Sequence, residues 1–587
     1  MNNPILYLFK KWWRFSKGNR KNVVLYISLF TIGQAFSFFE PLIIGLLLNT
    51  IQEQGVTDIR LLLGIALLYV GARFGFWLFH GPGRIIEISN AFHVRAQYKQ
   101  YLLTGVLNLP PKWHTDNHSG DSIDKIEKGT SALFEFSNIT FEIFDTVLRF
   151  LGSYLALIYF NFHTSYIVLF FVILTIITIL QFDKYIIPNY RQINQMENTI
   201  ASKMYDTISN ITTVIILRIE RLVSTDIYKS IMKPFRLFRK NSIINETKWF
   251  TVSMLTTGMV FFVLGSYLYQ AYLTQSTVML GTIYILYGYV ERINNLFYRF
   301  THRYGQIIKE YAAVNNAELL EKNFVKQKTV KRIHFPKTWK RLLIQNLNFS
   351  YDGKSSGALH LNNVSLTFKR GERIAFIGES GSGKTTMLKV IRGLYHSPSY
   401  QLFIDDQPIA HGFKAIKEDI SLIPQDPEIF NATIRENITF GIRHKQSTIL
   451  TYTDMARFTQ VVKRLPQQWD SSIVEKGVNL SGGEKQRLAL SRGLLACQDK
   501  PFVLLDEPTS SVDPKNELLI YKSIFRKFKR KTIISTIHRL HLLPLFDTIY
   551  IFDKGEIVAV GSYKQLQKTS PIFRQILKKY AKSQEIE

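Results

Sequence analysis

Gly378-Glu379-Ser380-Gly381-Ser382-Gly383-Lys384-Thr385 is the stretch that decides the fold of the C-terminal part of this chain. A short apolar segment, residues 374–377, predicts a buried strand before it, and a helix is expected to continue from Thr386. In that context the backbone N–H groups of the glycine-rich loop and of the helix N-terminus surround the phosphates of a nucleotide. Lys384 is expected to bring charge to the β- and γ-phosphates, and the Thr385 hydroxyl to bind Mg²⁺. The stretch therefore predicts a nucleoside triphosphate site.

A second buried strand ends in two adjacent carboxylates. Residues 502–505 are apolar, and Asp506 and Glu507 follow them directly. Asp506 is expected to hold Mg²⁺, directly or through water, and Glu507 to act as the general base that polarises the attacking water. An acidic pair that merely closes a strand is the alternative, and the presence of the phosphate-binding loop argues against it.

Composition limits the remaining possibilities. The chain has 587 residues, which is too long for one domain, and a formal net charge of +28. Its basic residues flank apolar segments and form no patch interleaved with aromatic residues, so the charge indicates a positive-inside membrane bias and no nucleic-acid binding. Cys497 is the only cysteine. A disulfide within the chain and a cysteine metal cluster are therefore excluded, and Cys497 is expected to be buried in a helix.

The N-terminal half contains six segments with the length and apolar composition of membrane spans. The third and sixth are interrupted by charges, at Asp145 and Arg149 and at Glu291 and Arg292. The expected spans cover residues 23–48, 61–81, 138–160, 165–187, 251–272 and 277–297.

The links between these spans alternate in length and charge. The links 82–137 and 188–250 are long and basic, whereas the others are short and nearly uncharged. The positive-inside rule places the long links, both termini and the nucleotide-binding part in the cytoplasm. The basic, aromatic N-terminus is expected to form an interfacial helix with Trp12 and Trp13 at the level of the lipid headgroups.

Glu40 and Arg73 lie inside expected spans, where charges are costly and often functional. Both can face a central cavity, or they can pair with each other, and the sequence leaves these alternatives open. A purely structural pair or a side chain that reaches the membrane surface would need no contact with a substrate.

The run Leu480-Ser481-Gly482-Gly483-Glu484-Lys485-Gln486 resembles the signature loop of ATP-binding-cassette (ABC) proteins. With the six spans before it, nearly the whole chain resembles an ABC exporter of the half-transporter type. This resemblance implies a membrane all-α six-helix transmembrane domain followed by an α/β P-loop NTPase, the ABC cassette. The expected division is a transmembrane domain at 1–310, a linker at 311–340 and a nucleotide-binding domain at 341–587.

The resemblance also implies roles for residues outside the two motifs above. Tyr351 looks like the aromatic residue that stacks on adenine, and Gln425 like the glutamine that senses Mg²⁺ and water. Ser481, Gly482, Gly483 and Glu484 look like the loop that binds the γ-phosphate of ATP held by the opposite subunit. Asp513, in Ser511-Val512-Asp513, looks like the D-loop aspartate, and His538 like the switch histidine.

Three further segments are assigned by the same resemblance. The helices that dock on the nucleotide-binding domain are expected near His114–Asp121 and, with a weaker match, near Ser209–Ile216. The family usually has Gly-Glu-X-Gly before the signature loop, and this chain has Val474-Glu475-Lys476-Gly477. That departure concerns coupling to the membrane helices and leaves the hydrolytic residues intact.

The function implied is ATP-driven export of an amphipathic or hydrophobic small molecule or lipid by alternating access. In this family two chains face head to tail and enclose two ATP molecules with Mg²⁺. All consensus catalytic residues are present, which favours a homodimer, and a heterodimer remains open. The expected surroundings are membrane lipid in a bacterial inner (cell) membrane. The alternatives are a peptide exporter, a siderophore importer of exporter architecture, an ABC-type channel or regulator, and a soluble ABC ATPase.

Overall fold

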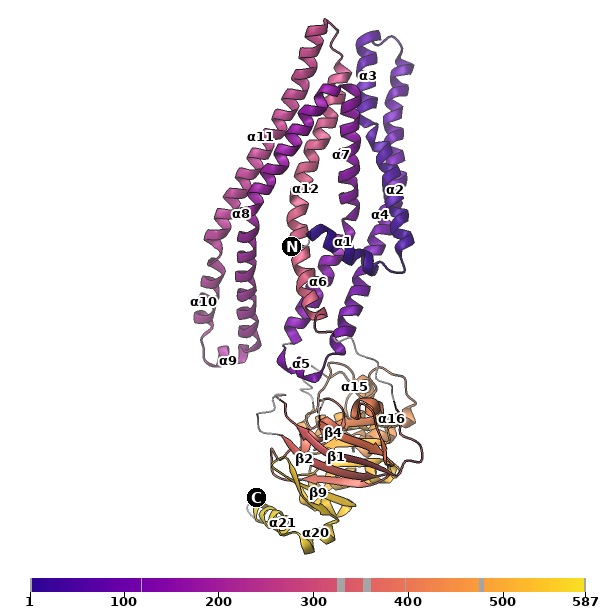
Figure 1. The fold of residues 1–587 in the computed structure, drawn as a ribbon, viewed down its shortest axis with the longest axis vertical. Coiled ribbons are helices and arrows are strands. Elements are labelled where there is room, and N and C mark those ends of the chain that lie inside the picture. Colours follow the sequence, from indigo (N-terminus) through magenta and orange to yellow (C-terminus); the bar gives the residue numbers. More distant parts are fainter. Residues whose placement is uncertain are drawn as a thin grey trace. The chain divides into compact units, whose positions relative to one another are not determined.

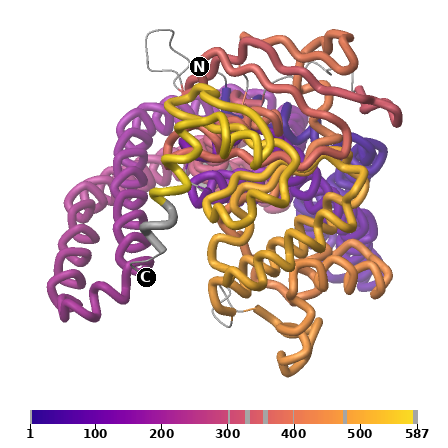
Figure 2. Tube along the Cα trace, turned by 90° about the horizontal axis from the view of Figure 1, so that it is seen from below, coloured from indigo at the N-terminus to yellow at the C-terminus, as the bar shows by residue number. Residues whose placement is uncertain are grey.

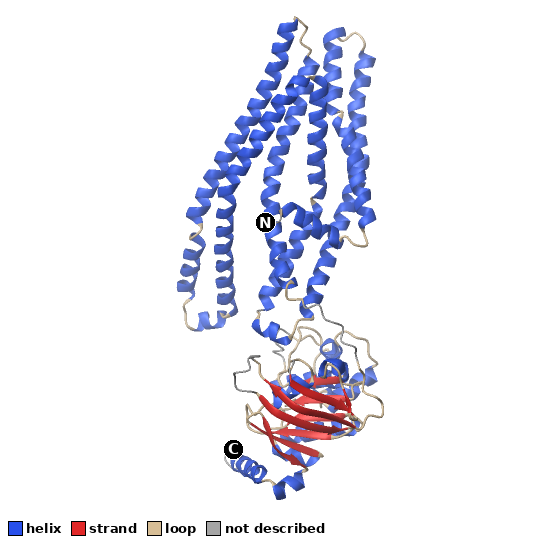
Figure 3. Ribbon diagram, viewed as in Figure 1, coloured by secondary structure: helices blue, strands red, loops and turns tan. Residues whose placement is uncertain are grey.

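The computed structural model describes residues 3–117, 119–324, 333–351, 360–395, 397, 399–473 and 480–584, and of residues 300–302 and 580–584 the backbone alone. The chain forms two units. One comprises Met1–Asn108 with His118–Phe324, and the other Leu109–Asn117 with Val325–Glu587. Long helices build the first unit, whereas the second contains all the strands of the described residues (Figure 3).

The first unit is a bundle of long helices (Figure 1). Its helices are α1 (Pro4–Phe15), α2 (Arg20–Phe38), α3 (Glu40–Gln54), α4 (Ile59–Leu107), α6 (Ser119–Asn138), α7 (Thr140–Phe160), α8 (Phe162–Ser209), α9 (Ile211–Ile216), α10 (Glu220–Met232), α11 (Phe235–Thr274) and α12 (Leu280–Glu321). Short connections separate consecutive helices. Asp58 accepts from the backbone N–H groups of Arg60 and Leu61 and starts α4.

Five helical stretches of the described chain are long and apolar enough to cross a membrane. They are Arg20–Gln54, Ile59–Leu107, Ser119–Phe160, Phe162–Ser209 and Glu220–Thr274. Each contains one of the first five expected spans. The sixth expected span, 277–297, lies in α12 from residue 280 on. It is not among the five, because tyrosines, asparagines and the Glu291-Arg292 pair lower its hydropathy. A multi-pass helical domain is therefore established, and the count of six spans stays a prediction.

Helix packing in this unit is close. α8 and α11 lie side by side along their length (Figure 1, Figure 2). α3 approaches α12 at two glycines, where a Cβ on Gly281 would lie 1.9 Å from the carbonyl oxygen of Gly45. The backbone N–H of Gly281 also donates to Asn49 Oδ1 at 2.7 Å. The α3–α12 contact thus has no room for a side chain at position 281.

The expected N-terminal helix is present as α1, and one of its faces packs against the bundle. Leu8, Trp12 and Phe15 of α1 are buried against the bundle, and Lys11 Nζ lies 2.8 Å from Glu321 Oε1 of α12. The Trp12 ring thus packs against the protein, and its placement at headgroup level stays a prediction. Trp13 is 41 % exposed.

Glu40 and Arg73 form an ion pair, one of the alternatives that the sequence left open. Arg73 Nη1 lies 3.1 Å from Glu40 Oε1, and Arg292 Nη2 lies 3.1 Å from Glu40 Oε2. One carboxylate thus joins α3 to both α4 and α12.

The second unit contains two sheets. The strands are β1 (Arg341–Phe349), β2 (Leu361–Lys369), β3 (Arg373–Ile377), β4 (Ser399–Ile404), β5 (Gln407–Pro408), β6 (Ile420–Ile423), β7 (Phe502–Asp506), β8 (Thr532–Thr536), β9 (Thr548–Asp553) and β10 (Glu556–Gly561). The smaller sheet has the order β2-β1-β4-β5 and the larger one β10-β9-β3-β8-β7-β6. In the larger sheet all neighbouring pairs except β9–β10 are parallel.

The second unit also contains helices. They are α5 (Pro111–Asp116), α13 (Lys384–Ile391), α14 (Phe413–Ile416), α15 (Ile434–Thr439), α16 (Gln446–Met455), α17 (Thr459–Arg464), α18 (Gly482–Ala496), α19 (Pro514–Lys527), α20 (Tyr563–Thr569) and α21 (Pro571–Gln584). Alternate residues of β7 belong to different hydrophobic cores, Val503 and Leu505 to one, Phe502 and Leu504 to the other. A sheet buried on both faces explains why its strands read as unbroken apolar runs.

The expected domain boundary at residue 310 falls inside α12, which continues to Glu321. α5, from the first expected docking segment, belongs to the second unit although its neighbours in sequence belong to the first.

Candidate functional site

Parallel strands end at one edge of the larger sheet and bring the predicted residues together there. The Gly378–Thr385 loop follows β3, Glu507 follows β7, and His538 follows β8. Since these three strands are adjacent and parallel, the loops after them are neighbours, and such an edge is where ligands bind in open α/β sheets.

The loop after β3 closes around its own lysine. Lys384 is 5 % exposed, and its Nζ donates to the carbonyl oxygens of Gly378 at 2.9 Å and Glu379 at 2.8 Å. Burial lowers the pKa of the Lys384 ammonium, and Glu507 and Asp506 oppose that effect. Gly378 has φ +149°, and a Cβ there would lie 2.1 Å from the Phe552 carbonyl oxygen, so this position requires glycine.

The rest of this loop is arranged as a turn before α13. Ser382 is buried with its Oγ 3.4 Å from Lys384 Nζ, whereas Ser380 and Gly381 are exposed. Gly383 precedes α13 as its cap, and Thr386 lies in the first turn. The Glu379 side chain points to solvent and pairs with Lys579 of α21 at 2.7 Å.

Thr385 and Asp506 offer adjacent oxygen atoms. Thr385 Oγ1 lies 2.9 Å from Asp506 Oδ1, and Thr536 Oγ1 of β8 lies 2.9 Å from the same carboxylate oxygen. Burial raises the pKa of Asp506, and the hydrogen bonds from Thr536 and Thr385 hold it down. A hydroxyl beside a buried carboxylate fits Mg²⁺, which prefers hard oxygen ligands.

The Glu507 carboxylate is held by two predicted partners. His538 Nε2 lies 2.6 Å from Glu507 Oε1, and Gln425 Nε2 donates to Glu507 Oε2 at 3.3 Å. The backbone N–H of Glu507 donates to Thr536 Oγ1 at 2.9 Å, where φ of Glu507 is +47°. In this arrangement Gln425 contacts the expected base, not Asp506.

Tyr351 lies beside the loop. Its hydroxyl donates to Thr386 Oγ1 at 3.2 Å, and its ring has edge contacts with Phe349, His360 and Tyr395. Lys112 of α5 donates to the Tyr351 carbonyl oxygen at 3.1 Å. The first expected docking helix thus touches the backbone of the expected adenine-stacking residue.

The Ser481–Glu484 turn caps α18. Ser481 Oγ accepts from the backbone N–H of Glu484 at 3.3 Å, and the backbone N–H of Ser481 donates to Glu484 Oε2 at 3.0 Å. Glu484 therefore serves as a capping residue. Gly482 and Gly483 are the first two residues of α18.

Asp513 caps a second helix near that turn. Its Oδ1 accepts from the backbone N–H of Asn516 at the start of α19 at 2.9 Å, and this bond holds the pKa of Asp513 below its usual value. Gln486 joins the two turns by bonding Ser510 Oγ at 2.6 Å and the Ser511 N–H at 2.7 Å.

These turns do not complete the site after β3. Across the described chain, no hydrogen bond or ion pair joins the Ser481–Glu484 turn to the Gly378–Thr385 loop. The 474–477 segment before the turn lies outside the described residues, as does His118 in the first docking segment.

The sequence analysis did not identify two residues that help to hold the site together. Thr536 bonds the Asp506 carboxylate and the backbone N–H of Glu507 at the end of β7, and Gln486 fixes the turn before Asp513. A signal existed for Thr536, because it is a polar residue at the end of the buried strand 532–536 and directly precedes Ile537-His538. No such signal marked Gln486.

Two protein-family models match the chain in succession. The ABC transporter transmembrane region matches residues 23–289, and the ABC transporter model matches residues 361–510. The chain belongs to the ABC transporter family. It is an exporter-type half-transporter, with the membrane region fused before an ATP-binding domain whose family couples ATP hydrolysis to transport.

Relatives match along the same order of domains. An export ATP-binding/permease protein of Rickettsia bellii is 26% identical over 592 residues, covering 98% of this chain and 99% of its own. The ATP-dependent lipid A-core flippase of Haemophilus ducreyi is 34% identical over 238 residues, covering 40% of each chain. A solved structure of a bacterial Atm1-family ABC exporter with ATP bound shows the same fold, with TM-score 0.79 and 21% identity over 96% of this chain and 98% of that one.

Proposed function

We propose that this ABC transporter exports an amphipathic or hydrophobic small molecule or lipid, by alternating access, as a homodimer in a bacterial inner membrane. The membrane domain is assigned to residues 1–310 with six spans, the linker to 311–340 and the nucleotide-binding domain to 341–587. Relatives named for export and for lipid A-core flipping support this reading. The cytoplasmic side is assigned to both termini and to the long basic links.

The proposal of a dimer rests on one observation: within the described part of one chain, the Ser481–Glu484 turn is not bonded to the other residues of the nucleotide site. Lys384, Thr385, Asp506, Glu507 and His538 lie together at one sheet edge, and the Ser481–Glu484 turn has no bond to them among the described residues. A second copy, facing head to tail, supplies the missing turn. The exposed side chains of Ile215 and Ile216 on α9 suit the second docking contact in such a pair.

Each residue of the site receives a role on this basis. The loop N–H groups and Lys384 bind the ATP phosphates, Tyr351 stacks on the adenine, and Thr385, Asp506 and Gln425 hold Mg²⁺. Bound Mg²⁺ supplies charge neutralisation at the phosphates. Glu507 accepts the proton of the attacking water, and His538 orients the Glu507 carboxylate.

Complementation tests the dimer. A Lys384→Ala chain and a Ser481→Arg chain are each expected to be inactive alone, because every site then contains one defect. When the two are co-expressed, mixed dimers contain one intact site, so ATPase activity should return. If the sites were complete within single chains, co-expression would restore nothing.

Transport is tested in proteoliposomes with the cassettes outside. ATP-dependent accumulation of a fluorescent amphiphile is expected, and Glu507→Gln should abolish it. Asp499→Asn, which changes an exposed carboxylate after α18, should keep it. Accumulation only in vesicles of the opposite orientation would refute export and support an importer, and Glu507→Gln hydrolysis at the wild-type rate would refute the assigned base.

A further inference from the structure

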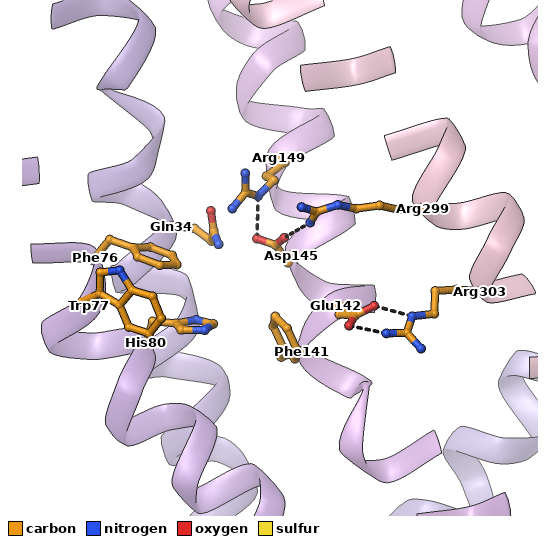
Figure 4. Close-up of a pocket in the computed structure, with 10 residues that line it drawn as sticks. All are labelled: Gln34, Phe76, Trp77, His80, Phe141, Glu142, Asp145, Arg149, Arg299 and Arg303. Carbon is orange, nitrogen blue, oxygen red and sulfur yellow. Dashed lines mark hydrogen bonds and ion pairs between the residues drawn. The ribbon is translucent and has the colours of Figure 1, made fainter. Parts of the chain in front are cut away.

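A cavity of about 480 Å³ opens within the helical bundle between α2, α4, α7 and α12 (Figure 4). All its lining residues belong to the first unit. It has two chemically different walls. Aromatic rings from α4 and α7 form one, and guanidinium groups from α7 and α12 the other (Figure 4).

The rings of the aromatic wall contact one another in series. The rings of Phe76 and His80 are stacked, with centroids 4.7 Å apart and planes at 17°. Trp77 meets His80 edge-on at 5.4 Å, and Phe141 of α7 lies 5.5 Å from His80. Trp77 is 62 % exposed and is one of the residues that line the cavity. Such a surface suits a planar or apolar body.

The opposite wall carries more positive than negative charge. Three guanidinium groups and two carboxylates line the cavity, so one positive charge remains when His80 is neutral. Arg303 is matched, because its Nε and Nη2 each lie 2.6 Å from a Glu142 oxygen. The excess therefore belongs to the other two arginines.

Arg149 and Arg299 share a single carboxylate. Arg149 Nε lies 2.9 Å from Asp145 Oδ1, and Arg299 Nη1 lies 3.6 Å from Asp145 Oδ2. No second carboxylate of the described residues lies within ion-pair distance of either arginine. The Arg299 side chain is 58 % exposed and Asp145 only 4 % exposed, so the guanidinium group faces the open space.

An unmatched charge in a membrane domain is costly unless a counter-ion meets it. Guanidinium groups bind carboxylate, sulfonate and phosphate oxygens through paired N–H donors. With an aromatic wall facing them, the cavity offers complementary surfaces to a molecule that has an oxyanion at one end and an apolar body at the other.

We propose that this cavity binds an amphipathic anion, with its oxyanion on Arg149 and Arg299 and its apolar body against Phe76 and Trp77. The inference rests on the proposed export function and names the substrate class of that function. A soluble amphiphile and an anionic lipid headgroup share this chemistry.

A second cavity of the membrane domain suits the opposite charge. It has a volume of about 450 Å³ and is lined by Glu246, Trp249, Phe250, Ser253 and Tyr298. It is shallower and carries a carboxylate beside stacked rings, so it would favour a cation. A matched cationic probe therefore belongs in the test.

The test measures binding without nucleotide. The purified dimer in phosphatidylcholine nanodiscs is equilibrated with 8-anilinonaphthalene-1-sulfonate by dialysis, with empty nanodiscs subtracted. Arg299→Gln should weaken binding by about tenfold or more, because a hydrogen bond to a charged group is lost. Trp77→Leu, on the opposite wall, should also weaken binding of the probe. It provides a second test if Arg299→Gln fails to fold.

Arg73→Gln is the matched control. Arg73 is also about half exposed and also shares a carboxylate with a second arginine, but it does not line the cavity. The affinity of the Arg73→Gln protein for the probe should stay within about twofold of the wild-type affinity. That change is smaller than the one expected from losing a hydrogen bond to a charged group. Equal affinity in wild type, Arg299→Gln and Trp77→Leu would overturn the proposal. The proposal would also be overturned if the cation tetraphenylphosphonium displaced the probe as readily as an unlabelled amphipathic anion did.

Adding phosphatidylglycerol to the nanodiscs distinguishes the two possible ligands, an anionic lipid headgroup and a soluble amphiphile. If phosphatidylglycerol competes with the probe in the wild type and not in Arg299→Gln, the anion is a lipid headgroup, and without competition it is a soluble amphiphile. Because binding is measured without hydrolysis, these results hold whether or not ATP-driven export is observed, and a failure of export would not be mistaken for a failure of the site.

Discussion

Replacing Thr536 by valine removes one hydroxyl that bonds both the Asp506 carboxylate and the backbone N–H of Glu507. Thr536 is fully buried at the end of β8. Its Oγ1 donates to Asp506 Oδ1 at 2.9 Å and accepts the backbone N–H of Glu507 at 2.9 Å. Valine has nearly the same shape, so the substitution opens little cavity and tests the two hydrogen bonds.

The magnitude follows from the partners that remain. The Glu507 N–H loses its acceptor, which costs about 1–3 kcal/mol for a buried donor, and Asp506 loses one of two hydroxyl donors, a bond to a charged group worth about 1.5–3 kcal/mol. We expect the domain to lose about 3 kcal/mol of stability. The backbone N–H of Glu507 then has no bond that fixes its position. We therefore expect kcat to fall by about tenfold or more, which is no larger than the contribution of a general base to the rate.

Thr532→Val is the matched control because Thr532 is equally buried at the other end of β8. Its Oγ1 also makes two backbone hydrogen bonds, to the carbonyl oxygen of Lys369 at 2.9 Å and from the N–H of Gly371 at 3.1 Å. It should destabilise the domain by a similar amount and leave kcat at saturating Mg·ATP nearly unchanged. Thr536→Ser, which keeps the hydroxyl, should recover most of the rate.

The assay combines ATP hydrolysis across pH with thermal unfolding in nanodiscs. The Thr536 bond lowers the pKa of Asp506 against burial, so its loss should raise that pKa and move the acidic limb of the rate profile to higher pH. Equal kcat values for Thr536→Val and Thr532→Val, with equal loss of stability, would refute the positioning role.

Two further predictions concern positions outside the site. Burial raises the pKa of the Cys497 thiol to about 11, so maleimide should label it only after denaturation. Because the unfolded thiol ionises near its ordinary value of 9.0, Cys497 should favour unfolding as pH rises from there to about 11, and Cys497→Ser should remove that dependence. Gly281→Ala should prevent folding of the membrane domain, because its Cβ would lie 1.9 Å from the Gly45 oxygen, whereas Gly71→Ala has open space and should express normally. Size-exclusion profiles in detergent distinguish these two.

The nucleotide site was predictable because its chemistry is local in sequence. The Gly378–Thr385 loop and the Asp506-Glu507 pair are short runs, and each requires a strand before it that the apolar pattern indicates. Parallel strands then bring those runs to one edge. The roles assigned to these residues remain predictions, which the experiments above address.

The membrane domain was less predictable, because its decisive contacts join residues far apart in sequence. The second arginine that pairs with Glu40, Arg292, lies in a different helix, and nothing in the pattern of span one indicates it. The packing of Trp12 against the bundle was likewise not predicted, because composition does not show which face of α1 is buried. The cavity between Trp77 and Arg299 likewise requires four helices at once, which periodicity cannot supply.

Two independent surfaces of the chain support the same partner. In the second unit, the Ser481–Glu484 turn is well ordered by its capping box and by Gln486, yet no bond among the described residues connects it to Lys384. In the first unit, α9 ends in isoleucines that are 56 % and 72 % exposed at 215 and 216. A polar turn and an exposed apolar helix end have different chemistry, and an unrelated partner would need to match each separately. A second copy of this chain meets both requirements, because it carries a Gly378–Thr385 loop for the turn and a nucleotide-binding domain for the helix.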